Sequence, residues 1–120
     1  MQIKVYVLQN CFFSNEAREL FKPFPHVKII EVDHTNKEKY KKIIRPWNTF
    51  PCIKIIYDGK QLTVGGLKEL QHILDNEFIL KDACDNTDKF KNTLSDIEQV
   101  IKINKKYICK FFKALYKPNN

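Results

Sequence analysis

The chain has no long apolar run, few cysteines and little glycine. No stretch of about 18 uncharged apolar residues occurs, so no membrane span is readable, and the N-terminus MQIKVYVLQN lacks the apolar core and cleavage site of a signal peptide. Four cysteines in 120 residues are too few for a disulfide scaffold, so free thiols are the starting interpretation. The chain has three glycines and five prolines, and it shows no internal repeat and no low-complexity segment. We expect a cytoplasmic protein, or one of the host cytoplasm or virion if a virus encodes it.

The charge of the chain is unevenly spread. Its 21 basic and 14 acidic side chains give a formal net charge of +7, and residues 101–120 contain six lysines and no acidic residue. Such a basic segment can attract nucleic acid, an anionic membrane or an acidic protein, but it also suits the solvated face of a helix. We favour the solvated face.

The spacing of apolar residues predicts strands alternating with helices in the first part of the chain. A period of two in Gln2–Leu8 indicates a strand, and the spacing of three and four in residues 12–22 indicates a helix that Pro23 ends. A well-buried strand is expected at residues 27–32. Thr35 and Glu38 have the spacing of a capping box, which predicts a helix from there to about residue 44.

The next elements complete an α/β domain, which we assign to residues 1–78. Asp58-Gly59 is a strong hairpin signal between strands at Cys52–Tyr57 and 60–64, and a helix follows Gly65-Gly66. The first strand-helix-strand unit must be parallel and the hairpin antiparallel. The sequence therefore predicts a four-stranded mixed sheet with helices on both faces.

The remaining residues, 79–120, form a basic extension. Residues 82–91 are polar and irregular, and Ser95 with Glu98 offers a second capping box ahead of an amphipathic helix over about 95–116. The apolar stripe of this helix includes Ile101, Ile108, Phe111 and Leu115. The stripe either packs on the sheet domain, which we favour, or pairs with a second chain as in a homodimer.

Cys11 lies between a predicted strand and a predicted helix. The unpaired N–H groups of the first helical turn and the helix dipole, about half a positive charge, favour a thiolate there over a thiol. Ser14 could donate a hydrogen bond to the sulfur, which again favours the charged form. Cys11 is therefore a candidate nucleophile, although a cysteine at such a place can also be plain packing.

Two further segments could bind a peptide near this cysteine. Thr49, Phe50 and Pro51 precede a strand, and a cis X-Pro bond there would expose the preceding backbone N–H and C=O to a bound peptide. Gly65 and Gly66 precede a helix, where backbone amides can hold a carboxylate.

Together these motifs resemble the glutaredoxins of the thioredoxin-fold superfamily, over about residues 2–77. The residues that carry the likeness stand in the family's order and spacing: Cys11-Phe12-Phe13-Ser14, Trp47-Asn48-Thr49-Phe50-Pro51 and Gly65-Gly66. The Cys-x-Phe-Ser form is similar to the monothiol branch, whose members have Cys-Gly-Phe-Ser. The resemblance implies a thioredoxin-like fold, a four-stranded mixed sheet flanked by helices.

The resemblance also implies roles for single residues. Cys11, assisted by Ser14, is the nucleophile that attacks glutathione mixed disulfides or protein disulfides, and a second glutathione resolves the intermediate. Glutathione or peptide binding is assigned to Phe12, Phe13, Thr49, Phe50, Pro51, Gly65 and Gly66. No cofactor is required, glutathione is a possible co-substrate, and no metal site is expected.

Three positions depart from the family pattern. The lysine that usually precedes the cysteine is absent, and Lys68 stands where the family has an aspartate that pairs with the ammonium group of glutathione. Losing one such charged contact costs about 1.5–3 kcal/mol. Phe12 replaces the glycine that leaves room for a shared [2Fe–2S] cluster in monothiol relatives, so cluster binding is not expected.

The other cysteines each allow two interpretations. Cys52 is either a small buried hydrophobic residue, which we favour, or a thiol that resolves Cys11 through an intramolecular disulfide. Cys84 and Cys109 are either free thiols, which we favour, or paired if the extension folds back. The three histidines show no ligand spacing, and Trp47 is interpreted as packing around the site.

The sequence therefore supports two functions from different classes. The first is a monothiol thiol-disulfide oxidoreductase centred on Cys11, which acts in electron transport between thiols and disulfides. The alternative is a catalytically weak binding or adaptor module whose basic C-terminal helix mediates dimerisation or binds a partner.

Overall fold

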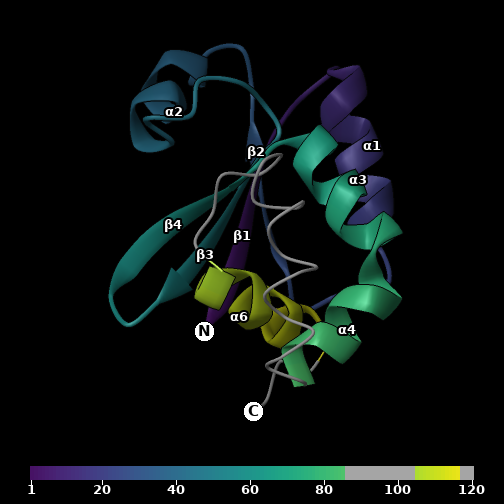
Figure 1. The fold of residues 1–120 in the computed structure, drawn as a ribbon. Coiled ribbons are helices and arrows are strands. Elements are labelled where there is room, and N and C mark those ends of the chain that lie inside the picture. The colour runs from purple at the N-terminus through teal and green to yellow at the C-terminus, as the bar shows by residue number, and fades with distance from the viewer. Residues whose placement is uncertain (86–104, 117–120) are drawn as a thin grey trace.

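A four-stranded mixed sheet forms the centre of the computed structural model, which describes residues 1–85 and 105–116. The strands are β1 (Gln2–Leu8), β2 (Lys28–Val32), β3 (Cys52–Tyr57) and β4 (Lys60–Gly65). Their order across the sheet is β2-β1-β3-β4 (Figure 1). β1 pairs with β2 in parallel and with β3 antiparallel, and β3 and β4 form an antiparallel hairpin.

Helices cover both faces of this sheet. The described helices are α1 (Phe12–Phe21), α2 (Lys37–Ile43), α3 (Leu67–Asp75), α4 (Glu77–Asp85) and α6 (Lys105–Tyr116). α1 connects the parallel strands and lies beside α3 on one side of the sheet, whereas α2 stands apart from them (Figure 1). The predicted α/β class and the mixed sheet flanked by helices are confirmed.

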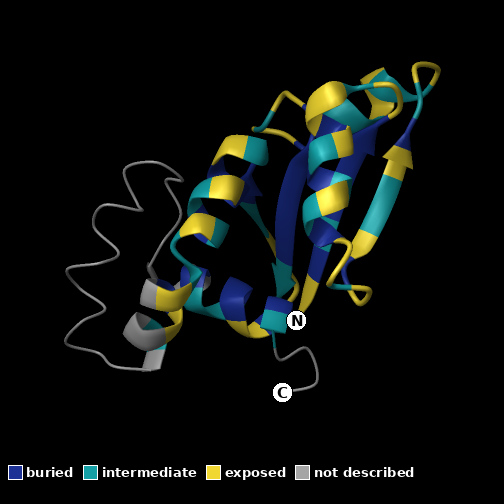
Figure 2. Cartoon of the chain, turned by 90° about the vertical axis from the view of Figure 1, so that its right-hand side faces the viewer, coloured by how far each residue is buried: buried dark blue, intermediate teal, exposed yellow. Residues whose placement is uncertain are grey.

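The central strands are buried on both faces, and their side chains alternate between two apolar clusters. On β1, Ile3, Val5 and Val7 enter the larger cluster, which also contains side chains of α1, α3, α4 and α6. Tyr6 and Leu8 enter a smaller cluster, which the segment that follows α2 closes. Figure 2 shows these buried strands behind helices whose outer faces are exposed. The predicted period of two therefore places apolar side chains on both faces rather than one.

The β3–β4 hairpin agrees with its sequence signal. Asp58 and Gly59 both have positive φ angles, 51° and 74°, as a type I′ turn requires. Glycine adopts such an angle without strain, and aspartate is one of the few residues that tolerate it. The turn residues therefore determine the pairing of two strands that are adjacent in sequence.

β2 is less buried than its sequence predicts. It lies at the edge of the sheet, and Val32 is the one buried residue among its five. Ile29 and Ile30 are half-buried because an edge strand has a neighbour on one side only. The apolar residues of β2 were compatible with a central strand of the sheet. Only the strand order shows that β1 is central and β2 lies at the edge.

The predicted cap of α2 is wrong. Thr35 and Glu38 do not form a capping box, and α2 begins at Lys37. Instead the Asp33 carboxylate accepts hydrogen bonds from the N–H groups of Thr35 and Asn36, both at 2.9 Å. Hydrogen bonds from the Thr35 hydroxyl and the Asn36 N–H also hold the pKa of Asp33 below its ordinary value. A local turn at an aspartate has replaced the expected cap.

Residues of the C-terminal extension complete the larger cluster. Ile108, Phe111 and Leu115 of α6 are at most 1% exposed and pack in the same cluster as the β1 side chains. The described part of the apolar stripe therefore packs on the sheet, as favoured. The predicted helix start at Ser95 and the apolar positions 94–103 lie outside the described residues. Residues 82–85, expected to be irregular, belong to α4, which runs across residue 78.

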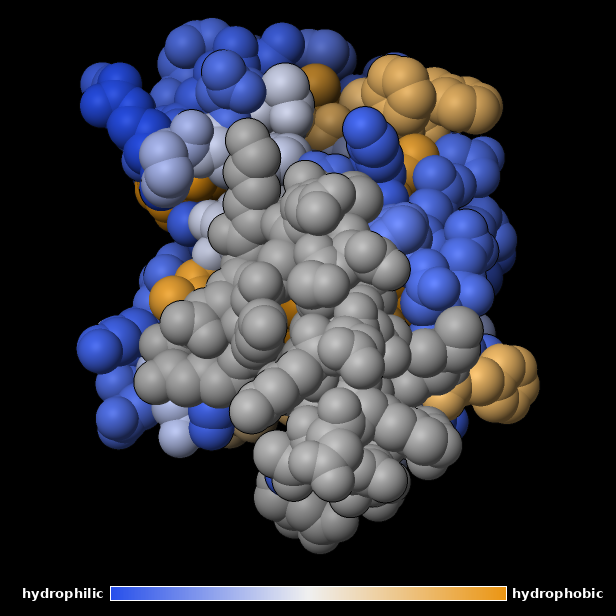
Figure 3. Space-filling view, in the orientation of Figure 1, coloured by the Kyte–Doolittle hydropathy of each residue, from blue (hydrophilic) through white to orange (hydrophobic). Residues whose placement is uncertain are grey.

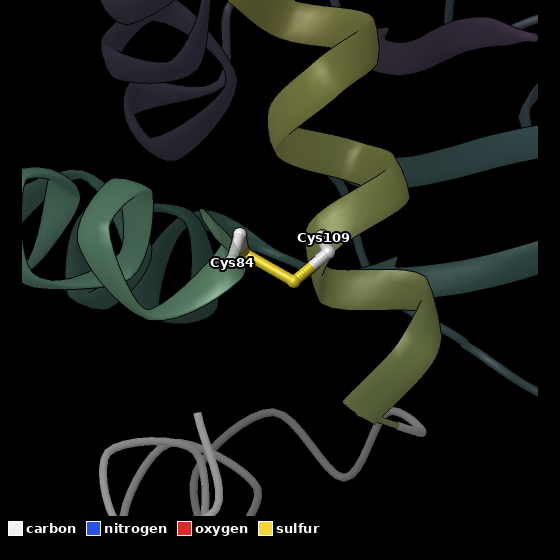
Figure 4. The surroundings of a disulfide bond; sticks show 2 residues. All are labelled: Cys84 and Cys109. Atoms are coloured by element: carbon white, nitrogen blue, oxygen red, sulfur yellow. A yellow bond between two sulfur atoms is a disulfide. The ribbon is translucent and has the colours of Figure 1, made fainter. Parts of the chain in front are cut away.

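Cys84 and Cys109 form a disulfide that joins α4 to α6 (Figure 4). Their Cα atoms are 5.6 Å apart, within the ordinary range, because the two helices contact each other. The prediction that both residues are free thiols is wrong. The pairing depends on two helices that meet in space although their cysteines are 25 residues apart.

Removal of this disulfide should destabilise the fold. The bond closes a loop of 25 residues, and opening a loop of this length lowers the free energy of unfolding by about 3 kcal/mol. Cys84→Ser should therefore unfold at a lower urea concentration than the wild type in oxidising buffer. A reductant should bring the wild type to the midpoint of the variant, and equal midpoints without reductant would contradict the bond.

Truncating the core side chain of α6 should also destabilise the sheet. Phe111 has no exposed surface, so Phe111→Ala should lower the free energy of unfolding by about 3–5 kcal/mol. Lys113→Ala, at an exposed position of the same helix, is the matched control and should change it by less than about 0.5 kcal/mol. Urea denaturation measures both variants. Similar small effects would show that the sheet does not depend on α6.

Candidate active site at the start of α1

Cys11 is the N-cap residue of α1, directly after the turn that leaves β1. Its backbone is extended, with φ −107° and ψ 124°, and its carbonyl oxygen accepts a hydrogen bond from the Asn15 N–H at 2.9 Å. Asn10, with a positive φ of 57°, lies in the turn between strand and helix. The half-buried thiol therefore lies at the positive end of a helix, where unpaired N–H groups favour a negative charge.

Ser14 is fully buried and holds the first turn of α1 against the end of β1. Its Oγ accepts a hydrogen bond from the Leu8 N–H at 2.9 Å. Because the Leu8 N–H uses a lone pair of the oxygen, the hydroxyl proton remains available for the sulfur of Cys11. The hydrogen bond from this hydroxyl to the sulfur stays a prediction, whereas the sequence reasoning did not predict the bond to the strand.

The pKa of the Cys11 thiol lies below its ordinary value. Partial burial acts in the opposite direction, but the backbone N–H and the hydroxyl of Ser14, the N–H of Phe13 and the charge of Arg18 together outweigh it. The Cys11 side chain makes no capping hydrogen bond to the N–H groups of α1. These groups therefore lower the pKa by electrostatic attraction to the negative charge of the thiolate. A larger thiolate fraction makes the residue more nucleophilic near neutral pH.

Arg18 is a contributor that the sequence reasoning missed. Its guanidinium donates two hydrogen bonds to the Glu31 carboxylate of β2, at 2.7 and 3.0 Å, and also contacts the side-chain oxygen of Asn15. The pair with Glu31 offsets part of the Arg18 charge, which agrees with its small effect on Cys11. The signal in the sequence was a spacing of seven residues, which places Arg18 and Cys11 on one side of a helix.

An open cleft of about 400 Å³ lies between the first turn of α1, the loop before β3 and the first turn of α3. Five of the predicted binding residues line it: Phe13, Thr49, Phe50, Pro51 and Gly66. Its other walls come from Trp47, Leu67, Lys68, Glu69 and Gln71, which had not been assigned to binding. Cys11, Phe12, Ser14 and Gly65 do not line it. The structure thus brings together three segments that are far apart in the sequence.

The glycine pair allows close packing. Gly65 has a φ of 141°, and a Cβ there would lie 2.6 Å from the Cγ of Glu69. A Cβ on Gly66 would lie 3.2 Å from the carbonyl oxygen of Pro51 and 3.3 Å from the Trp47 ring. The Gly66 N–H donates to the Glu69 carboxylate at 3.3 Å. The Gly66 N–H, which was predicted to bind an anion, therefore already has a partner within the chain. A carboxylate of a ligand would have to bind the N–H groups that follow it in the first turn of α3.

The loop before β3 is anchored on one side and open on the other. The Phe50–Pro51 peptide bond is cis, as the sequence predicted. Phe50 packs in the smaller cluster beside Cys52, whereas Thr49 is exposed. Thr49, Phe50 and Pro51 all border the cleft. Because Phe50 anchors the loop in the smaller cluster, the loop presents a defined surface to a ligand.

Cys52 lies inside the smaller cluster and has no exposed surface. Burial raises the pKa of its thiol to about 12, and the nearby charge of Lys54 offsets this only in part. Cys11 packs against the same cluster. A thiol of this kind is protonated at neutral pH and is a weak nucleophile. These properties favour the interpretation of Cys52 as a small buried hydrophobic residue, and its role as a resolving thiol stays a prediction.

Phe12 and Phe13 form an exposed aromatic pair next to Cys11. Their side chains are 68% and 57% exposed, and the rings pack edge to face with centroids 5.6 Å apart. Figure 3 shows hydrophobic side chains gathered at the surface near this end of α1. Large apolar side chains exposed together are typical of a binding surface.

Comparison with known proteins adds no assignment: no protein-family model, no curated protein and no solved structure matches the chain. Within residues 1–85 and 105–116, no group of three or more His, Cys, Asp or Glu side chains is arranged to hold a metal ion. None of the helices in those ranges has the length and apolar character needed to cross a membrane.

Replacement of Ser14 should raise the pKa of Cys11. Ser14→Ala removes a hydroxyl that favours the thiolate, so the midpoint of the pH-dependent alkylation by iodoacetamide should move up towards the ordinary thiol value of about 8.5. The rate at neutral pH should fall, since the thiolate is the form that reacts. Lys22→Ala, at the far end of α1, should leave the midpoint unchanged. A wild-type midpoint at or above about 8.5 would contradict this electrostatic account.

Proposed function

We propose that the protein is a glutaredoxin-like monothiol thiol-disulfide oxidoreductase whose nucleophile is Cys11. The observation that carries the proposal is the lowered pKa of the Cys11 thiol at the N-terminal end of α1. A cysteine that only fills space does not need a stabilised thiolate, whereas a nucleophile does.

The proposed reaction is thiol-disulfide exchange. The Cys11 thiolate attacks one sulfur of a disulfide, so that a new S–S bond forms while the old one breaks and the other sulfur leaves as a thiolate. A second thiolate, from glutathione or another thiol, then attacks the mixed disulfide, releases the bound product and returns Cys11 as a thiolate. Overall, one disulfide is broken and one is formed.

A thioredoxin-like fold is part of the same proposal. The described elements are consistent with it, because the cysteine follows the first strand and a proline directly precedes β3. The strand order β2-β1-β3-β4 and the helices on both faces add support. The cleft that Phe13 shares with Phe50 and Pro51 agrees with a peptide site beside the nucleophile.

The cleft is the proposed binding site for glutathione or a peptide. Phe50 and Pro51 form the edge that would pair with the peptide main chain, and the first turn of α3 would meet a carboxylate. Lys68 also borders the cleft, and its charge would repel the ammonium group of glutathione. We therefore propose that glutathione binds without an ammonium contact at this position.

No [2Fe–2S] cluster is part of the proposal. Monothiol relatives that hold such a cluster have glycine directly after the cysteine, whereas this chain has Phe12. The Phe12 side chain is large and 68% exposed beside Cys11. A large side chain directly after Cys11 would leave less room for a cluster shared between two subunits than glycine does.

A binding module of weak catalytic activity is the alternative proposal. The exposed pair Phe12 and Phe13 favours it, since such a surface can bind a partner without chemistry. Dimerisation through the C-terminal extension would have to use residues other than Ile108, Phe111 and Leu115, because these lie in the core of the chain itself.

Mass spectrometry after brief exposure to oxidised glutathione tests the proposal. We expect one glutathione bound through a disulfide at Cys11 in the wild type, and none at residue 11 in Cys11→Ser. Cys52→Ala changes the other free cysteine and is the matched control. This variant should still form the adduct, because Cys52 is buried with a raised pKa.

Other results would change the assignment. A loss of two protons without an adduct, abolished in Cys52→Ala, would make Cys52 a resolving thiol. An unchanged mass in all variants would contradict the oxidoreductase and leave the binding module as the better account.

A further inference from the structure

A second, larger cleft shares Trp47 with the first. Its volume is about 730 Å³, and it lies between α2 and the loop that follows this helix. Lys41, Lys42 and Arg45 are among its walls. A cleft of this size has room for several side chains of a bound chain.

This second cleft is basic, and its charges are not needed by the core. Its walls contain three lysine or arginine side chains, Lys41, Lys42 and Arg45, and one acidic side chain, Glu38. None of the residues of α2 is buried, and the helix is attached to the sheet domain through Tyr40 and Ile44. Figure 3 shows the surface over α2 as hydrophilic. The charges are therefore available to a ligand.

Two of these charges have no acidic partner among the described residues. Glu38 pairs with Lys41 at 3.8 Å. No carboxylate in the described part of the chain forms an ion pair with Lys42 or Arg45. An anionic group that enters the cleft would therefore meet two cations that are not already neutralised.

Trp47 connects the basic cleft to the proposed thiol site. Its side chain borders both clefts. The ring also lies 3.3 Å from the position that a Cβ on Gly66 would take, so it is held against the first turn of α3. An extended chain that crosses this ring would occupy both clefts at once.

We propose that the second cleft binds an acidic segment of a protein whose disulfide reacts with Cys11. This inference rests on the proposed function and names its class of substrate. Aspartate or glutamate side chains pair with Lys42 and Arg45, while residues near the disulfide contact Phe13 and Pro51 in the first cleft. Opposite charges raise the rate of encounter and orient the bound chain.

The chemical step is the same exchange. The Cys11 sulfur bonds to one sulfur of the protein disulfide, and the other sulfur leaves as a thiolate. A nucleic acid would meet the same positive charges, but it carries no disulfide for the neighbouring thiol. A protein segment is the ligand that uses both clefts, which is why we favour it.

The test compares two synthetic peptide disulfides. Each is a symmetric disulfide of a short peptide with one cysteine, flanked on both sides by glutamates in one version and by glutamines in the other. The rate of formation of the Cys11–peptide disulfide is measured by quenching and mass spectrometry. At low ionic strength the acidic peptide should react about tenfold faster with the wild type. The ratio of the two rates should approach one at about 1 M salt.

A charge-reversed variant identifies the cleft. In Lys42→Glu combined with Arg45→Glu, the ratio of acidic to neutral rates should fall to about one or below. Lys28→Glu combined with Lys60→Glu makes the same change in net charge at exposed positions that border neither cleft. This control should keep the wild-type ratio.

The outcomes separate this inference from the function on which it rests. Hydroxyethyl disulfide, which is small and uncharged, reports the exchange reaction alone. If the wild type reacts with it but shows equal rates for both peptides, or if the control variant loses the ratio equally, the acidic-segment site is wrong and the oxidoreductase stands. If neither the peptides nor hydroxyethyl disulfide form a disulfide with Cys11, the proposed function itself fails.

A nucleic-acid site would give a different pattern. The two peptide rates would be equal, and a single-stranded oligonucleotide would bind to the wild type but not to the charge-reversed variant. This result would assign the cleft to nucleic acid instead.

Discussion

Burial of β1 and β3 on both faces is the constraint on which the rest of the structure depends. Val5 and Ile53 on one face, and Tyr6 and Cys52 on the other, are at most 3% exposed, so each face of the sheet needs a cover. α1, α3, α4 and α6 supply it on one face, and the segment after α2 supplies it on the other. Exposing these strands would return apolar surface to water at about 25 cal/mol per Å². This explains why α6, near the end of the described chain, belongs to the same core as the first strand.

The same constraint determines where Cys11 lies. A parallel neighbour for β1 requires a connection that crosses over the sheet, and here that connection is α1. The helix must therefore begin where the strand ends, and Cys11 occupies this junction. The hydrogen bond from the Leu8 N–H to Ser14 fastens the two elements together. Through its hydroxyl, Ser14 links the stability of this turn to the pKa of the thiol.

The surface around Cys11 is divided into parts with different chemistry. Phe12 and Phe13 present apolar rings on one side, and the two clefts meet at Trp47 on another. The Cys-Phe-Phe-Ser motif contains no second thiol. In the function proposed above, selectivity between disulfide substrates therefore comes from how the substrate is bound rather than from the sulfur. In the acidic-segment site proposed above, the uneven charge of α2 would supply one means, because charge acts over a longer range than apolar contact.

The sequence by itself determined those features that depend only on residues close together in the chain. Strand periodicity, the Asp58-Gly59 turn and the position of Cys11 between a strand and a helix are local properties, and the structure agrees with each. Only the tertiary structure decided which strand lies at the edge, that Cys84 pairs with Cys109, and that Trp47 is shared by two clefts. These features arise where segments far apart in the chain meet, and their geometry is set by how the helices pack on both faces of one sheet. No local pattern of side chains contains that information.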